Sequence, residues 1–144
     1  MSPRDFQSDT IRKRLVSLRR ILGELEIYRD SDAKELRSEL SQMYAVFFML
    51  QQVIDLATDI NQHIAATTLN VADSSSRRGF EDLIRAGILP ADLEQDFYKS
   101  AALRNVITHQ YVEVDLGIVS NSIPRVLDVY TQYVKSISRW LASR

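Results

Sequence analysis

The sequence has no cysteine, only four glycines and three prolines, and a formal net charge of −1. The absence of cysteine excludes disulfide bonds and thiolate metal sites, and it agrees with a reducing compartment. Few glycines and prolines disfavour a turn-rich β architecture and favour long helices. No apolar run approaches the roughly 20 residues that cross a bilayer, and the N-terminal segment lacks the apolar stretch of a signal peptide. We therefore expect an all-α protein of the cytoplasm that makes no membrane contact.

The near-neutral charge limits the partners that this protein binds. A general nucleic-acid-binding domain is usually markedly basic, so any contact with RNA has to be confined to a local site. With 144 residues, of which 45% are hydrophobic and 26% charged, the chain lies in the range of ordinary globular proteins. We expect residues 1–144 to form a single domain around one core.

Apolar side chains recur at intervals of three and four residues along most of the chain, which is the pattern of amphipathic α-helices. Gly87 fits the end of a helix, Pro90 the first position of the next one, and Asp115 the cap of the last. Pro124 lies inside that last helix and predicts a kink or a break. The second helix carries two adjacent apolar stripes and is expected at the centre of the fold. The pattern as a whole predicts five helices, at about residues 7–28, 33–66, 77–86, 90–109 and 116–142.

The first predicted helix carries basic side chains off its apolar stripe, and these are open to two interpretations. They form either a basic face for phosphates or an ordinary solvated helix surface. The residues are Arg12, Lys13, Arg19 and Arg20.

Three potential ligands follow one another along one face of the second predicted helix. Asp55, Asp59 and His63 stand at positions i, i+4 and i+8. Carboxylates and imidazoles bind metals and transfer protons, so a metal or acid–base site is one interpretation. The other is pairing between neighbours four residues apart, which orders the helix surface.

The segment from residue 101 to residue 111 brings an arginine, an amide, a histidine and a tyrosine into eight positions: Arg104, Asn105, His109 and Tyr111. Asn105 and His109 are four residues apart and share a helix face, whereas Arg104 and His109 are separated by about 140° on an ideal helix. Convergence of Arg104 and His109 therefore needs a helix that ends near His109, side chains that bend around, or two chains that pair their helices.

These side chains have the chemistry to cleave RNA without a metal ion. A histidine takes the proton of the ribose 2′-hydroxyl or gives one to the leaving 5′-oxygen. An arginine beside it stabilises the charge that builds on the phosphate oxygens in the transition state. Asn105 is suited to orient the imidazole or bind a phosphate, and Tyr111 to contact a base or a phosphate.

A structural interpretation of the same residues is also open. Arginine and histidine are common, and this spacing often occurs by chance. In this interpretation Arg104 pairs with a surface carboxylate such as Glu94 or Asp96, and His109 is a hydrogen-bonded residue at a helix end.

The order of these residues is similar to the signature of the HepT-like family within the HEPN superfamily, Arg-Asn-x-x-x-His-x-Tyr. Arg104, Asn105, His109 and Tyr111 fill its four positions. Other segments that resemble the family follow in the correct order, so the resemblance covers about residues 40 to 135. They are Leu50-Gln51, Ile54-Asp55, Asp59-Ile60 and His63 in the second helix, Phe80 and Leu83 in the short helix, and Val114-Asp115 after the motif.

The resemblance implies a HEPN-type up-and-down helical bundle that forms a homodimer, with the arginine and histidine of both chains lining one cleft. It implies a metal-independent endoribonuclease toxin without a cofactor, which cleaves mRNA or tRNA. It also implies a cognate minimal nucleotidyltransferase antitoxin that neutralises the toxin.

The resemblance also assigns a role to each residue of the motif. Arg104 stabilises the transition state, His109 is the acid–base residue, and Asn105 supports them. Tyr111 is the expected acceptor of AMP from the antitoxin, with Tyr98 as the other candidate. We expect AMP on Tyr111 to repel the RNA backbone and block the cleft, because it adds bulk and negative charge.

Two other functions fit the same sequence. The chain is either a non-catalytic partner or nucleotide-binding subunit of a nucleotidyltransferase, or a dimerisation domain whose residues 104–111 hold the interface. In the first of these, Arg104 and His109 bind a nucleotide phosphate. Only the ribonuclease predicts harm to a cell that lacks the partner, relieved by His109→Ala.

Overall fold

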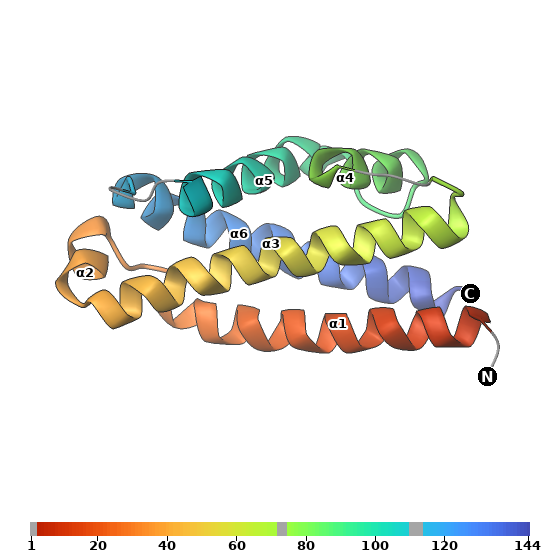
Figure 1. Ribbon diagram of the computed structural model, residues 1–144, viewed down its shortest axis with the longest axis horizontal. Helices are drawn as coiled ribbons and strands as arrows, with labels where there is room; N and C mark the ends of the chain where they lie inside the picture. Colours follow the sequence, from red (N-terminus) through yellow and green to blue (C-terminus); the bar gives the residue numbers. More distant parts are fainter. Residues whose placement is uncertain (1–2, 72–74, 110–113) are drawn as a thin grey trace.

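The computed structural model describes residues 3–71, 75–109 and 114–144, and within these ranges every regular element is helical (Figure 1). This confirms the all-α class. Two short 3₁₀ turns, η1 (Glu26–Tyr28) and η2 (Ala91–Leu93), precede the second and fifth helices. The α-helices are α1 (Pro3–Leu25), α2 (Ala33–Ser38), α3 (Leu40–Thr68), α4 (Ser76–Arg85), α5 (Glu94–His109) and α6 (Leu116–Ala142).

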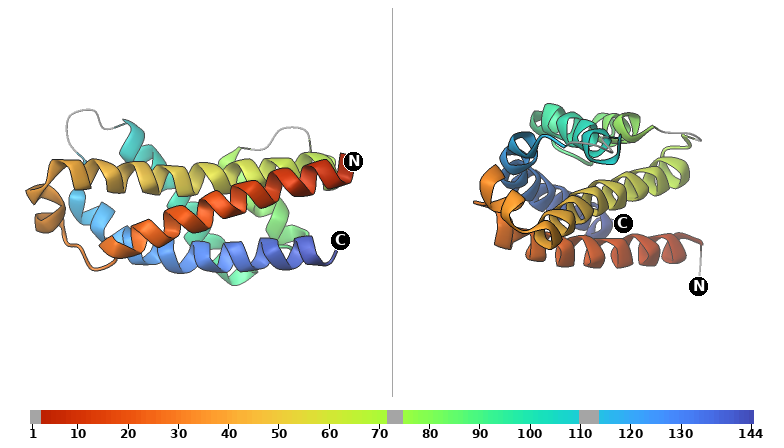
Figure 2. Two further views of the ribbon diagram at one scale, coloured as in Figure 1. Left: turned by 90° about the horizontal axis from the view of Figure 1, so that it is seen from below. Right: turned by 60° about the vertical axis from the view of Figure 1, so that its left-hand side comes forward.

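Helix α3 is the central element, as its two apolar stripes predict. It runs the length of the molecule, with α1 on one side and α4 and α5 on the other (Figure 1), and it contacts all of the other described α-helices. Helix α6 packs against α1 and α5, and the views of Figure 2 show α1, α3 and α6 lying along one another. Successive long helices run in opposite directions, so the bundle is up-and-down.

The buried side chains are those that the helical periodicity selects. The stripe of α1 is buried along its whole length, and both stripes of α3 contribute to the same core. Four buried aromatic rings from α4, α5 and α6 form the centre: Phe80 stacks on Phe97 at 4.8 Å between ring centroids, and Tyr130 and Tyr133 meet these rings at steep angles. The buried stripe of α1 consists of Ile11, Leu15, Leu18, Leu22 and Leu25.

The two buried tyrosines tie three helices together through their hydroxyl groups. The Tyr130 hydroxyl lies 2.6 Å from Ser100 Oγ of α5. The Tyr133 hydroxyl donates to Asn61 Oδ1 at 2.7 Å and approaches the Ala57 carbonyl at 3.1 Å, both on α3. Burial raises the pKa of both phenols, since a charged phenolate would lose its hydration. These bonds fix how α3, α5 and α6 lie relative to one another.

Two glycines, one inside α4 and one just after it, have a structural role. A Cβ on Gly79 would lie 3.1 Å from the Asn61 Cβ, so glycine lets α4 approach α3 closely. Gly87 has a φ of +78°, a conformation that glycine adopts at little cost. The predicted helix end at Gly87 is confirmed.

Some predicted helix limits are wrong. The second helix, expected to be unbroken over residues 33–66, is interrupted at Glu39, whose backbone is extended (φ −142°, ψ 104°). The interruption yields six described α-helices instead of five, and it leaves Leu36 of the short α2 buried. Pro90 precedes η2 as its cap rather than opening α5. Helix α6 continues through Pro124, so the expected break does not occur.

Contrary to the expectation from the sequence, helix α3 is long and apolar enough to cross a membrane by length and composition alone. The core helix of a soluble protein meets the same criteria, and α3 contacts helices on several sides. Only 33% of its most apolar stretch is buried inside the described chain, however. One side of α3 is therefore apolar without being covered by this chain.

Candidate active site

Helix α5 is oriented by the side chains that it buries. Phe97, Ser100 and Leu103 recur every three residues and face the core. Arg104 follows this stripe directly and is half-buried, and Asn105 is exposed. The local sequence thus places the Arg104 side chain at the edge of the core, beside α3.

Arg104 forms an ion pair with Asp55 of α3. Its Nε donates to Asp55 Oδ1, and the pair joins α5 to the central helix. The side chains are 35% and 36% exposed, so both groups remain accessible from solvent. Thr108 Oγ1 also donates to the Arg104 carbonyl at 2.9 Å, in the last turn of α5. The guanidinium is thus held in one place while part of it stays open to a ligand.

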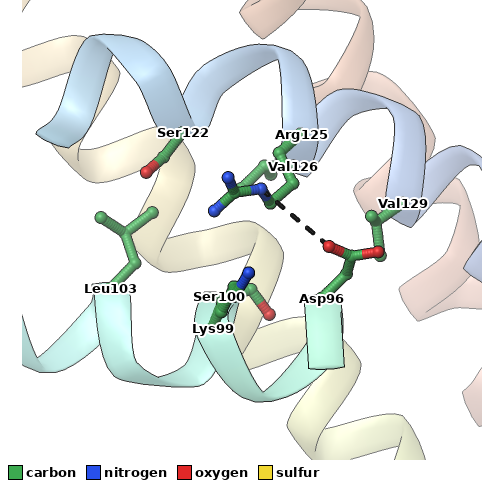
Figure 3. Close-up of a pocket in the computed structure, with 8 residues that line it drawn as sticks. All are labelled: Asp96, Lys99, Ser100, Leu103, Ser122, Arg125, Val126 and Val129. Carbon is green, nitrogen blue, oxygen red and sulfur yellow. Dashed lines mark ion pairs between the residues drawn. The ribbon is translucent and has the colours of Figure 1, made fainter. Parts of the chain in front are cut away.

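The structural interpretation is right that Arg104 pairs with a carboxylate, but the two suggested partners are wrong, because they are engaged elsewhere. Glu94 accepts a hydrogen bond from the Tyr98 hydroxyl at 2.7 Å. Asp96 faces Arg125 of α6 at 4.0 Å across a small pocket between α5 and α6 (Figure 3). Arg104 instead selects a carboxylate 49 positions earlier in the sequence.

A second ion pair of the same kind lies one turn further along α3. Arg14 of α1 donates from Nε to Asp59 Oδ2, and its Nη1 approaches the Thr10 carbonyl at 3.4 Å. Asp55 and Asp59 are therefore each held by an arginine from another helix, and not by the expected pairing four residues apart. Within the described ranges, no group of three or more acidic and histidine side chains is arranged to hold a metal.

Arg14 was not singled out in the sequence analysis. The basic residues that were singled out on α1 are exposed: Arg12, Lys13, Arg19 and Arg20. Lys13 pairs with Asp9 of its own helix at 3.4 Å, and Arg19 donates to Ser138 at 3.1 Å. These contacts are those of a solvated helix surface. Arg14 differs from its neighbours in reaching α3, and only the packing of α1 reveals this.

A hollow follows the face of α3 that carries the two aspartates. Asp55 and Asp59 both line it, with α5 on one side of α3 and α1 on the other (Figure 1). Arg104 and Arg14 therefore reach this face from opposite sides. The lining residues are Gln52, Asp55, Leu56, Thr58, Asp59 and Gln62.

The end of α5 carries the rest of the motif. The described part of α5 reaches His109, so the convergence of Arg104 and His109 stays a prediction. The His109 side chain and Tyr111 lie outside the described residues. Helix α6 begins soon after, at the predicted cap: Asp115 Oδ1 accepts the N–H groups of Gly117 at 3.0 Å and Ile118 at 3.2 Å.

The up-and-down bundle, with an Arg-x₄-His motif in α5 beside the central helix, agrees with the resemblance to HEPN-type helical domains. A family model described as Ribonuclease HepT-like matches residues 1–137. The chain therefore belongs to the HepT-like family, as its motif predicts.

Curated relatives and solved structures agree with this assignment. The chain is 28% identical over 131 residues to the tRNA nuclease HepT of Aphanizomenon flos-aquae, covering 91% of this chain and 89% of the relative. It is 24% identical over 131 residues to the mRNA nuclease HepT of Shewanella oneidensis, covering 90% and 97%.

Among solved structures, the tri-AMPylated Shewanella oneidensis HEPN toxin in complex with MNT antitoxin is similar with a TM-score of 0.80. It is 23% identical, and the match covers 91% of this chain and 98% of that chain. A toxin–antitoxin crystal structure with AMP-PNP is similar with a TM-score of 0.78 and 22% identity, covering 90% and 98%. These similarities confirm the HEPN-type fold.

Proposed function

We propose that this chain is a metal-independent endoribonuclease, the toxin of a toxin–antitoxin pair, which acts on mRNA or tRNA in the cytoplasm. Membership of the HepT-like family and similarity to two named nucleases support this function. The observation that carries it is the partly exposed Arg104, held by Asp55 beside a hollow on α3, in the same helix as His109.

The proposed reaction needs only groups of the RNA and of this chain. The ribose 2′-oxygen attacks the adjacent phosphorus while His109 accepts the hydroxyl proton. Arg104 binds the non-bridging oxygens, on which negative charge accumulates. The bond from phosphorus to the 5′-oxygen breaks, and a proton from histidine is delivered to that oxygen. The products carry a 2′,3′-cyclic phosphate and a 5′-hydroxyl, and Asn105 supports the imidazole or the phosphate.

Asp55 has a positioning role in this proposal. A guanidinium has five N–H donors, and the bond from Nε to Asp55 uses one of them. Its planar shape then fixes where the other donors point. Asp55 therefore aims Arg104 at a phosphate without contacting the RNA itself.

The exposed side of α3 supports a homodimer. Leu40, Tyr44 and Phe48 follow one another every four residues and are 59%, 60% and 62% exposed. Tyr44 and Asp55 are eleven residues apart, about three full turns, so the stripe shares a helix face with the site. A second copy covering this stripe would bring its own Arg104 and His109 towards the same cleft. A protein surface, and not lipid, is the fitting cover, because the same face continues to the ion-paired carboxylates of Asp55 and Asp59.

A cognate minimal nucleotidyltransferase is the proposed antitoxin, with Tyr111 as the acceptor of AMP. The environment of Tyr98 supports this choice over the alternative. The Tyr98 hydroxyl donates to Glu94, and the Arg77 guanidinium lies 4.2 Å from the centre of its ring. Burial first, and then the bond to Glu94, raise the pKa of Tyr98, which disfavours the phenolate nucleophile.

The proposed function is tested by incubating the purified protein, free of any partner, with cellular RNA and tRNA in excess EDTA. Wild type is compared with His109→Ala, Arg104→Ala and the control Arg125→Ala. The control removes an arginine that pairs with an aspartate away from the hollow. Each variant is first checked for helicity and oligomeric state. Cleavage by wild type and Arg125→Ala alone, leaving cyclic-phosphate ends, is the expected result.

Two outcomes contradict the proposal. Equal cleavage by all four proteins means that another site or another protein is responsible. No cleavage by wild type, with no AMP found on Tyr111 by mass spectrometry, favours the non-catalytic partner of a nucleotidyltransferase.

A further inference from the structure

We propose that Arg14 of α1 is a second phosphate-binding residue, which holds the RNA phosphate next to the one that is cleaved. This inference rests on the proposed ribonuclease function and adds a substrate subsite to it. It starts from the repetition of one contact: two arginines from different helices donate through Nε to two aspartates on one face of α3.

The two aspartates hold both arginines along one face of α3. Asp55 and Asp59 are four residues apart, which is about 6 Å along a helix and nearly the same face. This rise is comparable to the distance between neighbouring phosphates of an extended RNA strand. Arg104 reaches the face from α5 and Arg14 from α1, and both aspartates line the hollow on this face of α3. A strand that crosses α3 at this hollow meets both guanidinium groups.

Arg14 is accessible to such a strand. Its side chain is 31% exposed and that of Asp59 is 42% exposed. Its contacts with Asp59 and the Thr10 carbonyl use two of the five N–H donors of a guanidinium. Asp59 thus holds Arg14 as Asp55 holds Arg104, with donors remaining for a phosphate.

A purely structural role explains the Arg14 pair less well. Helix α1 is already fixed by five buried apolar side chains along its length. An ion pair this exposed adds little to stability, because water screens it and two side chains must be ordered. Of the neighbouring basic residues, Lys13 pairs with Asp9 of its own helix and the exposed Arg19 donates to a serine of α6, so neither reaches α3. A cation that is ordered, half-exposed and aligned with Arg104 is better suited to bind an anion.

The first test separates the two phosphates by substrate length. Cleavage by wild type, Arg14→Gln, Arg14→Lys and the control Lys13→Gln is measured on a dinucleotide, which has one phosphodiester, and on a longer RNA. Arg14→Gln is expected to leave kcat/KM on the dinucleotide unchanged and to lower it about tenfold on the longer RNA, mainly through KM. Arg14→Lys keeps the charge and is expected to restore part of the loss. Lys13→Gln removes the same charge from solvent and is expected to match wild type.

The second test measures binding without cleavage. In His109→Ala protein, the affinity for a fluorescent oligoribonucleotide is followed against salt, with and without Arg14→Gln. Loss of one phosphate contact on a single strand is expected to reduce the slope of log affinity against log salt by about 0.7.

The outcomes distinguish this subsite from the ribonuclease function itself. Equal losses on both substrates, accompanied by a lower melting temperature, would identify Arg14 as a structural clamp and overturn the proposal. Wild-type behaviour of Arg14→Gln in both tests would overturn it as well. In either case the nuclease would stand, because wild type would still cleave. If wild type cleaves neither RNA, the ribonuclease function fails and the subsite fails with it.

Discussion

At the scale of single residues, the two exposed aspartates of α3 determine where two arginines point. The two aspartates contribute more to the orientation of the arginines than to stability, since ion pairs whose side chains are 31–42% exposed are weak. Removing an aspartate and removing its arginine are therefore expected to affect activity far more than folding.

The Asp55→Ala variant tests this expectation. Arg104 would keep its charge but lose the acceptor that fixes it, so we expect kcat/KM for RNA to fall tenfold or more. The free energy of unfolding should change by less than about 1 kcal/mol. Initial cleavage rates and urea denaturation measure the two quantities. Asp96→Ala is the matched control, because it breaks the pair with Arg125 outside the hollow. A large loss of stability in Asp55→Ala with proportionate loss of activity would refute the positioning role.

The buried tyrosines make a prediction about alkaline pH. In the unfolded chain their pKa is near 10, and burial raises it in the folded state. Above pH 10 the unfolded chain therefore loses protons that the folded protein retains. Stability is fully present below pH 10 and should fall above it, by up to about 1.4 kcal/mol per pH unit for each tyrosine. Urea unfolding at pH 9, 10 and 11 measures the decline.

A double variant isolates this effect. Tyr130→Phe with Tyr133→Phe should be less stable than wild type at pH 9, because Ser100 and Asn61 lose their partners. Its stability should then depend less on pH between 10 and 11. An equally steep decline in the variant would assign the pH dependence to other groups.

Part of the site follows from the sequence, and part requires the fold. Arg104, Asn105, His109 and Tyr111 form a local motif, and local spacing is visible in a sequence. The partner of Arg104 is not, because Asp55 is 49 positions away and the packing of α3 against α5 selects it. Arg14 was missed for the same reason. The catalytic roles themselves stay predictions, to be decided by the variants described above.

At the scale of helices, Asp115 caps the start of α6. Asp115 accepts two backbone N–H groups there, which otherwise would lack partners inside the helix. Asp115→Ala should lower the free energy of unfolding by about 1 kcal/mol, whereas Asp115→Asn should retain most of it. Thermal melts followed by circular dichroism provide the measurement. Equal losses in both variants would mean that the charge, and not the cap, is important.

Helix number and core faces were largely predictable, because apolar periodicity reports which side of a helix is buried. The stripe of α1 is buried as expected, and the stripes of α3 are partly buried and partly packed against the edge of the core. The interruption at Glu39 was not predictable, since glutamate is a good helix former and the residues on both sides continue the pattern. The extended backbone there reflects packing of α2 against α6 and α3, a tertiary constraint. Pro124 is the opposite case, because proline usually interrupts a helix and α6 continues through it.

At the scale of the whole molecule, the apolar stripe on α3 predicts the assembly state. Phe48→Asp would place a charge in the proposed contact between two copies, so we expect a monomer with unchanged helicity and little nuclease activity. Light scattering after size-exclusion chromatography measures the mass, and circular dichroism the helicity. Val16→Asp on α1, also an exposed apolar position, is the control and should remain dimeric. A dimeric Phe48→Asp protein would place the interface elsewhere.

The continuity of α3 has a consequence for dosage. One uninterrupted helix of 29 residues carries the proposed contact between copies and the aspartates that hold both arginines. If the paired form is the active one, its amount at low abundance grows with the square of the number of free chains. A few chains that are not bound by the antitoxin would then be tolerated by the cell. A modest excess of toxin over antitoxin would be disproportionately harmful. The single helix α3 would in this way set a threshold concentration of free chains, above which the toxin harms the cell.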